Sequence, residues 1–186
     1  MNMIMGLILA AAAIAPVQEQ SARVDMDHPA FWTGAGGWRV FAYPDEQMCD
    51  LGMATPDDEY LTIGFRPREP GVNLLVTNKH ATSLRVGEMR RLSVSFAGVA
   101  DDEPHGVHAL SFEVVDADGR KLLSAANTYP TFLDDMAKAA EITVTTPQQG
   151  VVAKIPLSGT MEAVRQLRLC AIKAAGMDPE DPFLKN

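Results

Sequence analysis

Basic residues are scarce in this chain of 186 residues, which has 16 Lys and Arg against 24 Asp and Glu and a formal net charge of −8 at pH 7. Binding to nucleic-acid phosphates depends on clustered Lys and Arg, so this balance argues against a nucleic-acid-binding protein. It also argues against binding to anionic membrane surfaces. Residues 1–15 contain no charged side chain, so the whole excess of acid lies in the rest of the chain.

Several catalytic and nucleotide-binding motifs are missing. The glycines within residues 34–37 precede an expected strand, and no Gly-Lys-Ser/Thr follows them, so they do not form a phosphate-binding loop. There is no Gly-x-Ser-x-Gly segment, and no histidine follows Ser158 that could act as its base. We therefore expect Ser158 or Thr160 to cap a helix rather than to act as a nucleophile, and we expect no cofactor.

The longest apolar run lies at the N-terminus. Residues 1–15 are rich in Ile, Leu and Ala and end in small residues at Ala11, Ala13 and Ala15, a pattern typical of a signal-peptidase cleavage site. A membrane span needs roughly 20 consecutive apolar residues, and Pro16 with the polar residues after it ends this run too early. We expect a cleaved signal peptide over residues 1–15 and a periplasmic or secreted protein with no membrane span after cleavage. An apolar helix packed on the domain is the alternative.

One β-rich domain is expected over residues 37–176, between a flexible N-terminal arm at residues 16–36 and a tail at residues 177–186. Short segments rich in β-branched and aromatic residues alternate with turn residues at even intervals, as in antiparallel β proteins. The expected strands cover residues 37–43, 48–54, 60–65, 72–78, 89–96, 107–115, 121–125, 142–145 and 151–157.

The clearest hairpin signals are residues 67–71 and 116–119, because glycine permits the positive φ that tight turns need. Residues 116–119 also resemble the start of a calcium-binding loop. Asn127 stands where such a loop would need its closing acidic residue, so we expect a turn there and no calcium site.

Two segments have helical rather than strand periodicity. In residues 130–140 the apolar residues share one face, and Asp134 and Asp135 lie in the first turns, where the helix dipole favours anions. In residues 160–175 apolar residues recur at helical spacing, and Gly176 can end the helix. We therefore expect an α+β fold. It is mainly antiparallel β, as a sandwich or a curled sheet, with the C-terminal helix packed on the sheet and one short additional helix.

The chain has only two cysteines, Cys49 in an expected strand and Cys170 on the expected C-terminal helix. In an oxidising compartment a lone pair of cysteines most simply forms one disulfide, which here would attach the helix to the start of the sheet. A redox-active thiol commonly belongs to a Cys-x-x-Cys motif or a helix N-terminus. Neither residue is placed in this way, so we expect a structural disulfide.

One cluster of residues resembles a metal site, namely His105 and His108 with the preceding acids Asp102 and Glu103. Imidazole and carboxylate groups are suitable ligands for zinc or a similar ion. A regular strand points residues three apart toward opposite faces, so only a loop could bring the two histidines together. Histidines that simply face water are the structural alternative.

Four further residues are candidates for ligand binding. Arg168 falls on the apolar face of the expected helix, where an unpaired guanidinium would be unfavourable. It either reaches past that face to a carbonyl or carboxylate group, or it binds a ligand. Trp38, Arg39 and Tyr43, in and beside the first expected strand, are candidate liners of a groove.

Three segments together are similar to segments of known exported proteins. They are Trp38-Arg39-Val40 followed by Cys49, residues 74–78 leading through residues 83–87 into a strand, and Leu157-Ser158-Gly159-Thr160 followed by Cys170. The chain thus resembles a group of small exported proteins of Gram-negative bacteria that end in a Leu-x-Gly-Ser/Thr segment and an alanine-rich helix with a cysteine. It is more distantly similar to the invasion-associated locus B family, although the extra cysteines expected there are absent. The resemblance implies export, the disulfide and the fold, but it supplies no catalytic residue.

These observations favour a non-catalytic periplasmic protein that binds another envelope protein or a small ligand, because the sequence offers no convincing nucleophile, acid–base pair or metal set. One alternative is a metal-dependent hydrolase that uses Asp102, Glu103, His105 and His108. Another is a structural protein of envelope assembly, in which the acidic loops and residues 178–186 serve the assembly.

Overall fold

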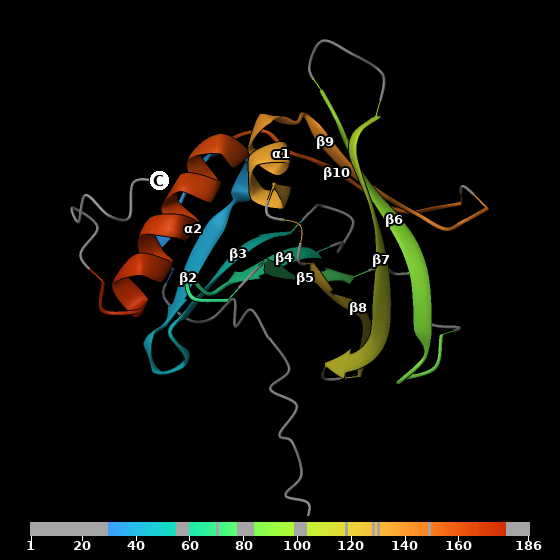
Figure 1. Ribbon diagram of the computed structural model, residues 1–186, viewed down its shortest axis with the longest axis horizontal. Coiled ribbons are helices and arrows are strands. Elements are labelled where there is room, and N and C mark those ends of the chain that lie inside the picture. Colours follow the sequence, from blue (N-terminus) through green and yellow to red (C-terminus); the bar gives the residue numbers. More distant parts are fainter. Residues whose placement is uncertain are drawn as a thin grey trace, which may run out of the picture.

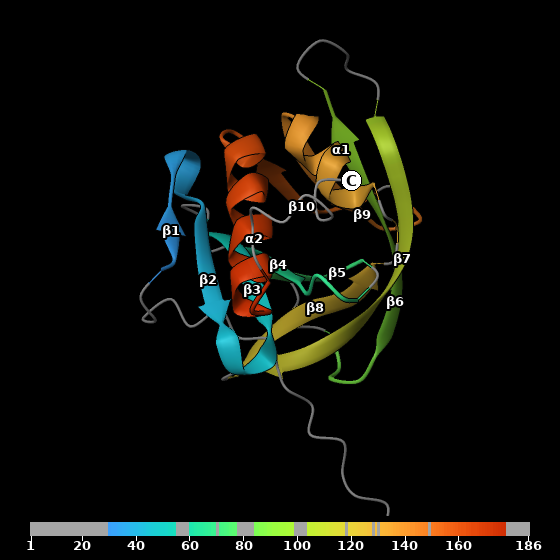
Figure 2. The same cartoon turned by 60° about the vertical axis from the view of Figure 1, so that its left-hand side comes forward.

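The computed structural model of the protein describes residues 30–54, 60–69, 71–77, 84–98, 104–117, 119–127, 129, 131–148 and 150–177. The expected signal peptide, the acids Asp102 and Glu103 and nearly all of the expected tail lie outside these residues, so the expectations for them stay predictions. The described residues form an antiparallel sheet with two α-helices, which Figure 1 and Figure 2 show from two directions.

All strands of the described residues belong to one 10-stranded sheet. They are β1 (Trp32–Thr33), β2 (Arg39–Tyr43), β3 (Met48–Ala54), β4 (Tyr60–Phe65), β5 (Val72–Thr77), β6 (Met89–Ala97), β7 (Pro104–Ala117), β8 (Arg120–Asn127), β9 (Glu141–Thr145) and β10 (Val151–Pro156). Their order across the sheet is β1-β2-β3-β4-β5-β8-β7-β6-β9-β10, and every neighbouring pair is antiparallel. Neighbours in the sheet are therefore consecutive in the chain except at β5–β8 and β6–β9.

Each expected strand is present with bounds that differ by at most a few residues. The largest difference is β7, which begins at Pro104 rather than at residue 107 and pairs with β6 through a register shift between Val94 and Phe96. Both expected hairpin turns are confirmed, since Gly71 and Gly119 have φ values of 88° and 76°. A residue with a side chain would be strained at either position.

The expectation that a flexible arm extends to residue 36 is wrong for its last residues. Trp32 pairs with Val40 and Thr33 with Arg39, which adds β1 to the edge of the sheet, and a 3-10 helix, η1 (Ala35–Gly37), follows. Trp32 also packs against the hydrophobic core. The glycine-rich sequence indicated flexibility, but these glycines instead let the segment pack closely on the rest of the fold.

The helices α1 (Phe132–Lys138) and α2 (Thr160–Ala174) lie within the residue ranges expected for them. Figure 2 shows α2 running alongside β2 and β3, and α1 contacts both α2 and β7. The apolar face of each helix is buried, through Leu133 and Met136 on α1 and through Val164 and Leu167 on α2. None of the helices in the described part of the chain is long and apolar enough to span a membrane.

The two ends of α2 are formed by glycines. At its end Gly176 has a φ of 68°, and the Met177 amide donates to the Ile172 carbonyl at 2.9 Å, which is a helix stop of the Schellman type. At its start the expected capping by Ser158 or Thr160 is wrong. Gly159 is the N-cap residue with a φ of 80°, no side chain caps the helix, and the Thr160 hydroxyl donates to the Leu157 carbonyl instead.

A disulfide joins β3 to α2. Cys49 and Cys170 are bonded, with 6.1 Å between their Cα atoms, and both are buried. The pairing expected from the sequence is confirmed. The bond closes a loop of 121 residues and holds the C-terminal helix on the first long strands of the sheet.

A second junction brings together the two ends of the domain. The Trp38 indole Nε1 donates to the Ser158 carbonyl at 3.0 Å, across 120 residues of sequence. A Cβ atom added at Gly36 would lie 2.4 Å from the same carbonyl oxygen, and one added at Gly159 would lie 2.8 Å from the Ala35 oxygen. Two of the segments that carry the family resemblance therefore meet through the Trp38 indole, and the close approach of the backbone beside this contact is why glycines occupy positions 36 and 159.

Candidate functional site

One face of the sheet is turned away from α2, and it carries a row of residues that crosses five strands. The row consists of Gly52, Thr62, Leu75, Ser124 and Glu113, each paired with the next on neighbouring strands. Successive residues of a strand point to opposite faces, and Cys49 on β3 points to α2. The row that begins at Gly52 therefore lies on the other face, which we call the outer face.

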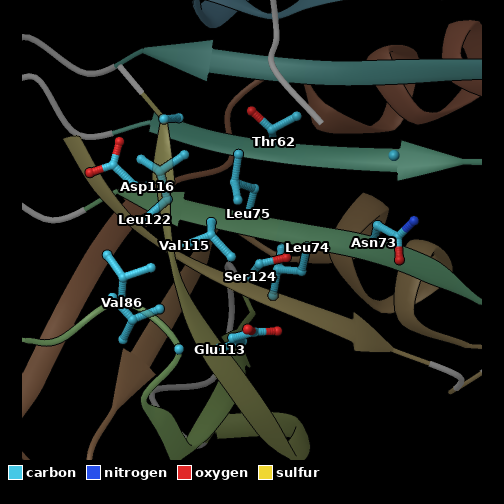
Figure 3. Close-up of a pocket in the computed structure, with 14 residues that line it drawn as sticks. Thr62, Asn73, Leu74, Leu75, Val86, Glu113, Val115, Asp116, Leu122 and Ser124 are labelled. Atoms are coloured by element: carbon cyan, nitrogen blue, oxygen red, sulfur yellow. The ribbon is translucent and has the colours of Figure 1, made fainter. Parts of the chain in front are cut away.

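A groove with a volume of about 600 Å³ lies on the outer face, and Figure 3 shows it in close-up. Strands β4, β5, β7 and β8 form its floor, and the turn before β6 forms one side. The lining residues are Thr62, Gly64, Asn73, Leu74, Leu75, Val86, Gly87, Glu113, Val114, Val115, Asp116, Ala117, Leu122 and Ser124. We call this feature the outer-face groove.

The centre of the outer-face groove is apolar. Leu122 pairs directly with Val115, and Leu75 lies on the neighbouring strand, so that the three side chains lie together in Figure 3. Val86 faces them from the turn before β6 and is 58% exposed. The turn is held against β7 by two backbone bonds, from the Gly87 amide to the Val114 carbonyl at 2.8 Å and from the Val114 amide to the Glu88 carbonyl at 2.9 Å. The groove thus has a preformed side.

The groove is not among the expected sites, although the sequence contains a signal for it. A strand with one solvated face alternates apolar and polar residues. Strands β5, β7 and β8 instead contain the apolar pairs Leu74-Leu75, Val114-Val115 and Leu122-Leu123. Such a pair places one apolar side chain on each face, so three neighbouring strands were able to build an apolar patch outside the core.

The charged residues among the groove lining are both acidic. The Asp116 carboxylate accepts a hydrogen bond from the Gly119 amide at 3.0 Å, so its role is partly to close the β7–β8 turn. The side-chain carboxylate of Glu113 makes no hydrogen bond or ion pair with any residue that the structure describes. The remaining polar side chains are the neutral groups of Thr62, Asn73 and Ser124. The groove therefore combines an apolar centre with an uncompensated negative charge.

A third acid lies at the end of the groove that Gly64 forms. Asp50 on β3 is fully buried, and neither of its carboxylate oxygens has a hydrogen-bond partner in the described residues. It pairs across the strands with Gly64, which pairs with Asn73, and both of these line the groove. A Cβ atom at Gly64 would lie only 3.0 Å from the Asp50 Oδ1 atom. The missing side chain therefore leaves room for the carboxyl group beside the groove.

Burial raises the pKa of the Asp50 carboxyl from its ordinary value of 3.8 to about 7, because the charged form loses its hydration. The nearby carboxylate of Glu46 raises the pKa further, and the guanidinium of Arg66 lowers it. Arg66 is shared with other acids, since it lies 3.5 Å from Glu46 and 3.5 Å from Glu69. Asp50 is therefore mostly uncharged in mildly acidic solution and ionises near neutral pH.

The expectation that Trp38 lines a groove is wrong, because its side chain is fully buried and bonded to Ser158. Arg39 and Tyr43 are partly exposed on β2, near the edge of the sheet. Neither is among the lining residues of the outer-face groove, so the structure does not bring the three expected residues together as a site.

Arg168 lies at the exposed edge of the apolar face of α2. Its Nη2 atom donates to the Asp134 Oδ1 atom of α1 at 2.8 Å, and the two side chains are about half exposed. Of the two interpretations from the sequence, the structure supports the ion pair with a carboxylate. The expectation that the guanidinium lies within the apolar stripe is wrong, because the Arg168 side chain is 44% exposed and paired with Asp134, although Leu167 and Ala171 beside it are buried.

His108 faces the core. Its Nε2 atom lies 3.6 Å from the Asp135 Oδ2 atom of α1 and forms no hydrogen bond with a described residue. The imidazole ring packs against aromatic rings, with centroid distances of 5.9 Å to Phe96, 5.4 Å to Phe132 and 4.6 Å to Tyr129. This arrangement holds α1 against β7.

The other members of the expected metal cluster are not described. Asp102 and Glu103 lie outside the described residues, and of His105 only the backbone in β7 is described. His105 pairs with Phe96 and His108 with Val94, so the register shift interrupts the simple alternation on which the sequence argument relied. Within the described ranges, no group of three or more His, Cys, Asp and Glu residues could hold a metal ion.

Comparison with known proteins gives one structural similarity. No family model and no curated protein matches the sequence. The fold is similar to the crystal structure of invasion associated protein B from Bartonella henselae, with a TM-score of 0.51 and 9% sequence identity over 72% of this chain and 93% of that chain. At this identity the similarity shows the fold alone. It agrees with the distant resemblance that the sequence has to the invasion-associated locus B family.

Proposed function

We propose that this chain is an exported, disulfide-stapled binding protein that holds a small amphipathic cation in the outer-face groove. The observation that carries the proposal is the apolar centre formed by Leu75, Val115 and Leu122 beside the unpaired carboxylate of Glu113. An apolar chain binds by leaving water, at roughly 25 cal/mol for each Å² that it buries. A positive group on the same ligand supplies the partner of opposite charge that the Glu113 carboxylate lacks.

The size of the groove favours a small ligand over a protein partner. Sites for small molecules typically have volumes of about 300–1,000 Å³, and the groove has about 600 Å³. A stable protein–protein interface buries about 800 Å² on each partner, which is a larger and flatter surface. A small ligand also fits an apolar patch that lies between polar side chains at both ends of the groove.

The charge of the protein supports a cationic ligand. The chain has a formal net charge of −8 at pH 7, and no Lys, Arg or His is among the lining residues of the groove. An acidic protein attracts a cation over a distance of about 10 Å in ordinary salt, and a fixed carboxylate then orients it. An anionic ligand of the same length would be repelled by the same groups.

The chemistry of the lining supports binding rather than catalysis. Thr62 and Ser124 contribute hydroxyl groups, but the lining has no imidazole, thiol or amine that could act on them as a base. The proposal of export is supported by the expected signal peptide and by the disulfide Cys49–Cys170, which forms most readily outside the cytosol.

Calorimetric titration with two ligands of equal chain length tests the proposal. Decylammonium is the amphipathic cation, and decanoate has the same chain with the opposite charge. We expect saturable binding of decylammonium, and binding of decanoate at least tenfold weaker. The substitution Glu113→Gln should weaken decylammonium binding severalfold, whereas the control Glu162→Gln, on the exposed side of α2, should leave it unchanged. Equal binding of the two ligands, or no binding of either, would contradict the proposal.

A further inference from the structure

We propose that the ligand of the outer-face groove is a linear aliphatic dication, with one positive group at Glu113 and the other beside Gly64, where its binding displaces the proton of Asp50. This inference rests on the proposed function, because it requires the same groove to bind a cation. It adds a second charge to the ligand and a role for a buried residue that the groove itself does not explain.

Two acids lie at opposite ends of the groove. Glu113 belongs to β7, and Asp50 lies beside Gly64 on β4, with β5 and β8 between them. Three strand spacings of about 4.8 Å separate β4 from β7, which is roughly 14 Å. On the strands in between, Ser124 and Leu75 lie in the same row as Glu113, and Asn73 lies in the same row as Gly64. An aliphatic chain that joins the two acids therefore crosses Ser124, Leu75 and Asn73, and Leu122 and Val115 lie beside the Glu113 end of that path.

The acid at the Gly64 end, Asp50, is unsatisfied. A buried carboxyl group normally has hydrogen-bond partners, because burying it without them is unfavourable. Both oxygens of Asp50 lack a partner among the described residues, although the residue is fully buried. At Gly64 no side chain stands between the Asp50 carboxyl group and the groove. An ammonium group above Gly64 would lie close enough to Asp50 to supply the missing charge partner.

Among the described residues, Arg66 is the basic group whose charge acts on Asp50. The residues around Asp50 on the outer face are Phe41, Arg39 and Tyr43 from β2, Met48 and Gly52 from β3, Asn73 from β5, Arg66 after β4 and Glu46 from the β2–β3 turn. Only Glu46 and Arg66 perturb the Asp50 charge noticeably, and they act in opposite directions. Arg66 is itself paired with Glu46 and Glu69 at 3.5 Å.

The proton balance follows from these positions. Without ligand, burial keeps the pKa of Asp50 at about 7, so the carboxyl group holds its proton in mildly acidic solution. A cation within about 4–6 Å favours the carboxylate and lowers that pKa. The O–H bond of Asp50 then breaks, the carboxylate keeps the electron pair, and the proton passes to the solvent. For each unit by which the ligand lowers the pKa of Asp50, the ligand binds tenfold more tightly at neutral pH than at acidic pH.

Calorimetry with decamethylenediamine, which carries an ammonium group at each end, tests the inference against decylammonium, which carries one. At about pH 6, titration in two buffers of different ionisation enthalpy should give the release of close to one proton for each diamine bound and none for decylammonium. The diamine should also bind at least tenfold more tightly at about pH 8 than at about pH 5.5. Asp50→Asn should abolish both effects, and Asp45→Asn, which alters an exposed acid in the 3-10 helix Pro44–Glu46 before β3, should preserve them.

The outcomes separate the two proposals. If decylammonium binds but the diamine releases no proton, the inference about Asp50 is overturned and the proposed function stands. If Asp50→Asn still releases a proton on binding the diamine, another group is responsible and the inference is again overturned. If neither ligand binds, the proposed function fails and the inference fails with it. Proton release from the unaltered protein is decisive even without the variant.

Discussion

The substitution Asp50→Asn should make the protein more stable at neutral and alkaline pH. The pKa of Asp50 rises from 3.8 to about 7 on folding, which is a shift of about 3 units. Each unit corresponds to about 1.36 kcal/mol, so the full effect is about 4 kcal/mol. Because the folded pKa is the higher one, the folded protein holds the proton more tightly than the unfolded chain. This contribution to stability is complete below about pH 4 and is lost as the pH rises toward and through 7.

Urea denaturation followed by circular dichroism, with the disulfide intact, measures this effect. Asparagine is uncharged at every pH in the range, so the free energy of unfolding of Asp50→Asn should not show this loss between about pH 4 and pH 8. Relative to the unaltered protein, the variant should gain up to about 4 kcal/mol across that window. The control Asp45→Asn removes an exposed carboxylate nearby and should leave the pH profile of the unaltered protein in place. A variant that parallels the unaltered protein at all pH values would refute the reasoning.

Three further substitutions test the structural account. Replacing Cys49 and Cys170 together with alanine should lower the free energy of unfolding by up to about 5 kcal/mol, the chain-entropy value for a loop of 121 residues, as measured by urea denaturation. Gly159→Ala should be clearly more destabilising than Gly119→Ala, although both positions have a positive φ, because only the first added methyl group meets backbone of η1; equal losses in melting temperature would contradict the junction. Arg168→Ala should cost less than about 1 kcal/mol, as expected for an exposed ion pair, and should not change ligand affinity.

Much of the fold was predictable because local signals in the sequence agree with its tertiary contacts. The turns at Gly71 and Gly119 need glycine for a local reason, and the helical spacing of apolar residues in 160–175 marks a buried face. The disulfide followed from composition alone, since two cysteines outside the cytosol allow one pairing within a chain. These inferences required no knowledge of which strands are neighbours.

The groove was not predictable because it depends on the order of strands in the sheet. Leu75 and Leu122 belong to β5 and β8, which are neighbours only because β8 inserts beside β5. The sequence places them only within the expected strands at residues 72–78 and 121–125. The apolar pairs that contain them indicate that each strand has an apolar residue on both faces. They do not indicate that the two strands are neighbours in the sheet.

Two single residues were misjudged for a different reason, which is that side-chain type does not determine exposure. Trp38 is a candidate groove residue from its place in the first expected strand, yet it is buried and donates to the backbone that precedes α2. Asp50 is not among the expected site residues, because acids are usually solvated. Its position between Cys49 and Leu51, in a strand whose residues are nearly all buried on both faces, was the one available sign.

The most direct test of the account is an amide NMR titration of the protein, with its disulfide intact, by decylammonium. The account predicts saturable shift changes at Leu75, Val115 and Leu122 on the outer face, and none of comparable size along α2. The same titration with decanoate should leave these signals nearly unchanged. Saturable shifts confined to other elements, or equal shifts with both ligands, would contradict the claim that the outer-face groove binds an amphipathic cation.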